Sequence, residues 1–191
     1  MPSQSLILWR TQARTAFDQI EHAHRAMGGP GPGRPYTTLH INHAYVVLLS
    51  SHFQRFCRDL HTEAIFHLWK HDTSPRRDIL KFNLQLHRQL DSRNPSPSAI
   101  GADFNRFDLS FWDLVKQNAP ALGARRQALL EDLNRWRNAI AHQDFSSHGL
   151  HPAGPLLRLI RQWRAACNAL ASRFDFVLRH HLATMTGVSP W

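Results

Sequence analysis

Residues 137–142 carry the clearest chemical signal in this chain of 191 residues. They read Arg-Asn-Ala-Ile-Ala-His, which places a permanent cation, a carboxamide and an imidazole within about one and a half helical turns. A guanidinium can hold phosphate oxygens through charge-assisted hydrogen bonds, and an imidazole titrates close to neutral pH. Arg137, Asn138 and His142 are therefore candidate catalytic residues for chemistry on a phosphodiester.

RNA is the phosphodiester that such a trio suits best, because its 2′-hydroxyl group is a built-in nucleophile. The protein needs only to move protons and to stabilise the charge that develops on the phosphate. His142 can deprotonate the 2′-hydroxyl or protonate the leaving 5′ oxygen, and Arg137 can hold the non-bridging oxygens. Asn138 would add a neutral donor or orient the imidazole. The expected product is a 2′,3′-cyclic phosphate, formed without a metal or other cofactor, and DNA should be resistant.

The motif and its surroundings resemble HEPN domains, which carry an Arg-x4-6-His signature with a polar residue directly after the arginine. Residues 44–56 (AYVVLLSSHFQRF) are similar to the long core helix of the RiboL-PSP-HEPN branch, and the likeness extends over roughly residues 36–182. The resemblance implies a metal-independent endoribonuclease that acts as a toxin or an anti-phage defence effector. An antitoxin or another regulatory protein is then an expected partner. Toxins of this family that are controlled by modification commonly have a tyrosine two residues after the histidine, but Asp144 stands there, so that route is not expected.

Helical geometry complicates a site built from one chain. At about 100° per residue, Asn138 and His142 lie about 40° apart, away from the apolar stripe, whereas Arg137 lies about 140° from His142. Either the helix loosens before residues 143–144, or a second subunit completes the site. The family resemblance favours the second option, because HEPN ribonucleases are typically dimers in which two motifs meet across a cleft. We therefore expect a homodimer with a composite active site.

Two less specific interpretations of the same residues remain open. Arg137 and His142 can be solvated residues near a helix end, where cations complement the helix dipole. The fold can also serve as a non-catalytic helical module that binds RNA or protein, or that dimerises. RNA cleavage separates these interpretations from the enzymatic one.

The charge balance favours an anionic partner. The sequence has 23 basic and 14 acidic residues, a formal net charge of +9, and nearly all of the positive charge is arginine. Arg125, Arg126 and Arg135 lie near the motif and are candidates to bind the RNA backbone. Arginines at positions 158, 161 and 164 recur on one helical face and form a weaker candidate track for phosphates.

Other classes of function have little support. Cys57 and Cys167 fall on apolar stripes and are expected to be buried thiols, which indicates a reducing cytoplasm. The longest apolar run, residues 44–49, is too short to cross a membrane, and no export signal opens the chain, so membrane association is not expected. Glu63, His67 and His71 recur at intervals of four, but the pattern lacks a fourth ligand, and no metal site is predicted.

Apolar periodicity predicts an all-α fold, a bundle of about five to six helices with a four-helix, HEPN-like core. The whole chain, residues 1–191, is expected to form one domain: an N-terminal helix and a Gly/Pro hinge (1–35), a core (36–182) and a tail (183–191). The expected helices span residues 5–27, 38–70, 74–91, 104–117, 122–141 and 156–182.

Overall fold

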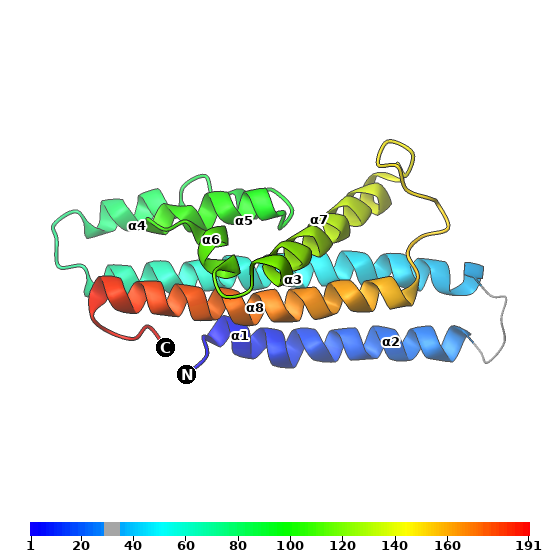
Figure 1. The fold of residues 1–191 in the computed structure, drawn as a ribbon, viewed down its shortest axis with the longest axis horizontal. Helices are drawn as coiled ribbons and strands as arrows, with labels where there is room; N and C mark the ends of the chain where they lie inside the picture. The colour runs from blue at the N-terminus through cyan, green and yellow to red at the C-terminus, as the bar shows by residue number, and fades with distance from the viewer. Residues whose placement is uncertain (29–34) are drawn as a thin grey trace.

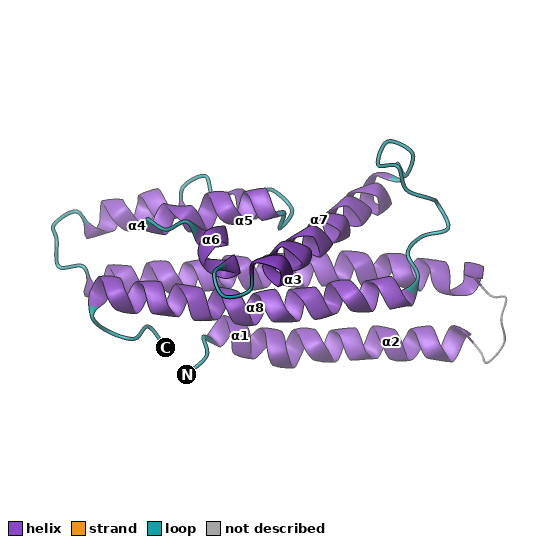
Figure 2. Ribbon diagram, viewed as in Figure 1, coloured by secondary structure: helices purple, strands orange, loops and turns teal. Residues whose placement is uncertain are grey.

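A computed structural model describes residues 1–28 and 35–191 and confirms the all-α fold. Figure 2 shows only helices and loops in these residues. The predicted Gly/Pro hinge falls largely on residues 29–34, which lie outside the described residues. In the described part of the chain no helix is both long and apolar enough to span a membrane.

The helices are arranged around two long central ones, α3 and α8. In chain order they are α1 (Gln4–Leu8), a π-helical turn (Trp9–Ala13), α2 (Arg14–Gly28), α3 (Pro35–His71), α4 (Arg77–Gln85), α5 (Pro97–Phe104), α6 (Phe111–Lys116), α7 (Pro120–His142) and α8 (Leu157–Thr186). Helices α3 and α8 lie side by side and run in the same direction, and α2 runs opposite to both (Figure 1). Helix α7 crosses them obliquely, while α4, α5 and α6 cover one end.

The N-terminal helices belong to the core. Leu6, Trp9 and Phe17 are almost fully buried, and the Trp9 ring packs edge-on against Phe17 and Phe53. Because aromatic side chains bury large areas, these contacts join α1 and α2 firmly to α3. The first helix, predicted as an N-terminal addition to a four-helix core, therefore packs into the same hydrophobic core.

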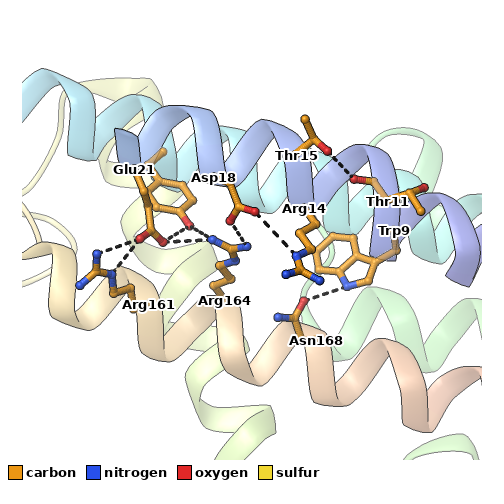
Figure 3. Close-up of polar contacts among 10 residues, drawn as sticks. Trp9, Thr11, Arg14, Thr15, Asp18, Glu21, Arg161, Arg164 and Asn168 are labelled. Carbon is orange, nitrogen blue, oxygen red and sulfur yellow. Dashed lines mark hydrogen bonds and ion pairs between the residues drawn. The ribbon is translucent and has the colours of Figure 1, made fainter. Parts of the chain in front are cut away.

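A polar network also ties α2 to α3 and α8 (Figure 3). The Glu21 carboxylate accepts hydrogen bonds from Tyr45 Oη at 2.9 Å, Arg161 Nε at 2.9 Å and Arg164 Nη1 at 3.1 Å. The other terminal nitrogen of Arg164 contacts Asp18 at 2.6 Å. Two of the three arginines in the candidate phosphate track are therefore engaged within the protein itself.

The two helices predicted over residues 74–91 and 104–117 are both interrupted. Helix α4 ends at Gln85, and His87 has a left-handed φ of 55° before a short 3₁₀ turn. Asp108, with φ of 60°, separates a 3₁₀ turn from α6 in the same way. The buried Asp103 carboxylate accepts the backbone N–H groups of Gln89 and Leu90 at 2.8 Å, a tertiary contact that competes with helix continuation.

Two side chains depart from their predicted environments. Leu156, the first residue of the helix predicted over residues 156–182, is the N-cap of α8 and is 76% exposed. Trp191, in the predicted tail of residues 183–191, is partly buried against the core. Cys57 and Cys167 are fully buried as predicted, and burial raises the pKa of both thiols, so neither is an activated nucleophile.

Helix α7 positions the motif. It is one residue longer at its C-terminus than predicted, and its buried stripe includes Leu133, Trp136 and Ile140. Gln143 ends the helix in the left-handed conformation, with φ of 54°. The Asp144 N–H then donates to the Ala139 carbonyl at 3.0 Å, which fixes the first residues of the following loop.

Candidate functional site

An open groove of about 600 Å³ runs along the exposed side of α7. Its walls come from α7, from the segment before α5 and from the loop after α7. All three predicted catalytic residues line it. The complete lining is Ser92, Arg93, Asn94, Ser96, Glu131, Asn134, Arg135, Arg137, Asn138, His142 and His148.

The motif side chains flank the groove without converging. Helix α7 stays regular through His142, so the option that it loosens before residues 143–144 is wrong. Arg137 and His142 keep their separation of about 140° around the axis, and Asn138 projects between them. Because the groove covers nearly half of the helix circumference, both flanking residues still line it. A phosphate lying over Asn138 would have a guanidinium on one side and an imidazole on the other.

The Asn138 amide is oriented by two neighbours. Its Oδ1 accepts a hydrogen bond from the Asn94 amide and a longer one, 3.4 Å, from Arg137 Nη1. With the oxygen occupied, the Asn138 amide N–H groups have no hydrogen-bond partner among the described residues and are left to donate into the groove. Among these residues Asn138 makes no hydrogen bond to His142, so the geometry favours the donor role over imidazole orientation.

The wall opposite α7 is a loop held in place by side-chain amides. Asn134 Nδ2 donates to the Pro95 carbonyl at 3.0 Å, and Gln54 Nε2 on α3 donates to the Arg93 carbonyl at 2.8 Å. Ser96 caps the N-terminus of α5. These contacts satisfy the loop backbone from the protein side, and Arg93 remains exposed toward the groove.

The groove carries an excess of positive charge. Arg93, Arg135 and Arg137 line it, against a single carboxylate, Glu131. Arg135 pairs with Asp132 at 2.6 Å and is therefore partly compensated. Among the described residues Arg137 has no carboxylate partner within 4.0 Å. Its guanidinium is thus available for an anion.

Of the three residues predicted to bind the RNA backbone, the structure brings only Arg135 to the groove. Arg125 and Arg126 lie near the start of α7, about 16–18 Å along the helix axis from Arg137 at 1.5 Å per residue. They line no part of this groove. An RNA strand reaching them would have to follow α7 for about three turns.

Sequence reasoning missed the contributions of Arg93, Asn94 and His148. Residues 94–98 gave only a turn signal, since Asn and Pro are common in loops of any function. Nothing in the local pattern at His148 relates it to a helix six residues away. Only tertiary contacts show that both loops border the motif helix.

The weak metal alternative on α3 receives no geometric support. Glu63 accepts the backbone N–H groups of Gln4 and Ser5 at 3.0 and 2.7 Å, so its carboxylate serves the N-terminus of α1. His67 Nε2 is within 2.9 Å of the Thr186 hydroxyl. In the described ranges no cluster of three or more His, Cys, Asp or Glu side chains is placed to hold a metal ion.

Comparisons of this chain with protein-family models, with curated proteins and with solved structures give no match.

Proposed function

We propose that this protein is a metal-independent endoribonuclease of the HEPN type, with its active site in the groove along α7. One observation carries the proposal: Arg137, Asn138 and His142 line the same positively charged groove, and the guanidinium has no carboxylate partner there among the described residues. The alternative interpretation, in which Arg137 and His142 are only solvated residues near a helix end, does not account for a shared groove. Nor does it account for the opposite wall, a loop held in place by side-chain hydrogen bonds.

The roles follow from the positions of the side chains. Arg137 holds the non-bridging oxygens of the scissile phosphate, and the Asn138 amide donates to the same group as negative charge develops. His142 transfers a proton at the 2′ or the 5′ oxygen. The reaction ends in a 2′,3′-cyclic phosphate and a free 5′-hydroxyl group. A toxin or anti-phage effector, restrained by an antitoxin or regulatory protein in the cytoplasm, is the biological role we propose for such an activity.

We also propose that the protein is a homodimer, and this part of the proposal can be tested separately from the roles of the side chains. A two-fold axis beside α7 would bring two grooves together. Mixing inactive Arg137→Ala and His142→Ala subunits tests this directly. If each site combined Arg137 of one chain with His142 of the other, half the dimers would be mixed and one of their two sites intact, restoring about a quarter of the activity. No recovery after exchange, shown by mass-tagged subunits, would place each site within one chain.

Cleavage of a mixed RNA substrate in EDTA tests the function itself. We expect wild-type protein to leave 2′,3′-cyclic phosphate ends, and an all-2′-deoxy version of the substrate to survive. His142→Ala and Arg137→Ala should each lower the cleavage rate by at least about 10²-fold while keeping the helical circular dichroism spectrum. Activity that persists in both variants would overturn the assignment of the site. Intact RNA that is nevertheless retained tightly would instead indicate a non-catalytic binding module.

A further inference from the structure

We infer that His148 is the second proton-transfer residue of the groove, so that one chain supplies both the general acid and the general base. This inference rests on the proposed ribonuclease activity. It goes beyond the Arg-x4-6-His motif, because His148 lies outside that motif, in the loop after α7. His142 and His148 are the two imidazoles that line the groove among the described residues.

The chemistry requires two proton transfers at different oxygens. As the 2′ oxygen bonds to phosphorus, it loses its proton, and as the bond from phosphorus to the 5′ oxygen breaks, that oxygen gains one. A neutral imidazole takes the first proton and an imidazolium gives the second, so protons and charge balance without a metal or an oxidant. A single histidine cannot be in both protonation states at once. Within one chain, the motif alone therefore leaves one transfer to water, to a second subunit or to another group of the same chain.

Local hydrogen bonds fix the conformation of the loop that carries His148. Asp144 Oδ1 accepts the Ser147 N–H at 3.1 Å and the Ser146 hydroxyl at 3.3 Å, closing a turn directly before His148. Hydrogen bonding from the side chain and then from the backbone N–H of Ser147 is the main reason that the pKa of Asp144 is lowered. Gly149 follows with a left-handed φ of 63°, which a side chain would strain.

Apolar anchors fix both ends of this turn to the core. Phe145 and Leu150 pack against the hydrophobic core, and the Leu150 N–H donates to the Phe145 carbonyl at 2.8 Å. The Phe145 ring stacks on His43 of α3 with 5.7 Å between ring centroids. His148 thus lies in a turn whose two ends are held against the core, and it is half-buried beside the groove. The loop visible beyond the end of α7 in Figure 1 is accordingly a groove wall.

The decisive test uses a leaving group that needs no proton. An RNA in which sulfur replaces the bridging 5′ oxygen at the cleaved position expels a thiolate, so loss of a general acid should matter little with it. On ordinary RNA we expect His148→Ala and His148→Gln to slow cleavage by about 10²–10⁴-fold. With the sulfur substrate, cleavage should become fast again in one of the two variants, either that at position 148 or that at position 142. It should stay slow in the other. The restored residue is then the acid and the other the base.

Two further readouts separate proton transfer from a structural role. The wild-type rate should be bell-shaped in pH, and His148→Ala should lose one limb of the bell. His151→Ala is the matched control, because His151 is an exposed histidine of the same loop that does not line the groove. It should cleave like wild type, and thermal unfolding of all variants should coincide.

The outcomes of these experiments distinguish a failure of the role of His148 from a failure of the proposed ribonuclease activity. Wild-type cleavage that is unchanged in His148→Ala would overturn the role of His148 and leave the ribonuclease assignment standing. Equal rescue of both variants by sulfur, or rescue of neither, would also overturn it. A wild-type protein that cleaves no RNA would remove the proposed function and this inference together.

Discussion

Two sets of arginines in this molecule differ in whether their guanidinium groups are paired with carboxylates. Arg164 on α8 contacts the carboxylates of Glu21 and Asp18 and is 16% exposed in its side chain. Among the described residues, the one hydrogen bond of the Arg137 guanidinium on α7 goes to a neutral amide, that of Asn138, at 3.4 Å. Both lie on amphipathic helices of the same bundle. The difference is that Arg164 of α8 faces the carboxylates of Asp18 and Glu21 on α2. Arg137 of α7 faces an open groove whose lining contains a single carboxylate, that of Glu131.

The comparison shows how a basic protein divides its charge between structure and ligand. A carboxylate partner satisfies a guanidinium and removes it from phosphate binding. A guanidinium without one keeps its hydrogen-bonding capacity for an incoming anion. We therefore expect substitutions in the α2–α8 network to change stability, and substitutions in the groove to change activity.

The largest effect expected from this comparison of arginines is on catalysis, at Arg137. Arg137→Ala should lower the cleavage rate by about 10²–10³-fold, because it removes donors aimed at the charge of the transition state. The free energy of unfolding should change by no more than about 0.5 kcal/mol, since no ion pair is lost. Rates on a labelled RNA and urea denaturation measure the two quantities. A large loss of stability would mean that Arg137 is structural after all.

The next effect is on stability, at Glu21. Glu21→Ala leaves Arg164 and Tyr45 largely buried without their shared acceptor, and we expect a loss of about 3 kcal/mol in the free energy of unfolding. Urea denaturation measures it. Glu131→Ala is the matched control: Glu131 is exposed on α7 and has no ion pair among the described residues, so its removal should be nearly neutral. Equal effects at the two positions would contradict the division of roles.

A smaller contrast should appear between the two partners of Glu21. The Arg161 side chain is 49% exposed and the Arg164 side chain is 16% exposed. Arg161→Ala should therefore cost about 1 kcal/mol or less, and Arg164→Ala at least twice as much. Neither should change the rate of RNA cleavage under conditions where both variants are folded. A strong loss of RNA affinity in either variant would instead support the hypothesis that the α8 arginines bind phosphates.

The smallest effect concerns acid pH. Burial acts to raise the pKa of Glu21, but hydrogen bonds from Arg161 and Tyr45 outweigh it, and the net pKa is lowered. A lowered folded-state pKa stabilises the protein above the unfolded value of about 4.3, and this contribution is lost as pH falls through the folded-state pKa. Urea midpoints measured between about pH 3 and 6 should therefore fall less steeply toward acid in Glu21→Gln than in wild type. Identical slopes would show that Glu21 does not titrate with folding.

Much of the fold could be predicted because the long helices carry strong apolar periodicity. Residues 38–70 and 122–141 were placed within a few residues of α3 and α7, since each has a continuous stripe and clear ends. The interruptions at His87 and Asp108 could not be predicted. The first lies beside the contacts that Asp103 makes with Gln89 and Leu90. The second lies beside a contact between the Phe107 carbonyl and His181 Nε2 on α8, at 2.8 Å.

The sequence by itself determined the helical class and the chemical identity of the motif, because periodicity and residue type are local properties. It also determined that Arg137 and His142 point about 140° apart, since helical geometry depends only on spacing. Tertiary structure decided that both still line one groove, that Arg93 and His148 join them there, and that Arg161 and Arg164 do not. These outcomes depend on which loop or carboxylate packs beside each side chain, and that is set by folding of the whole bundle.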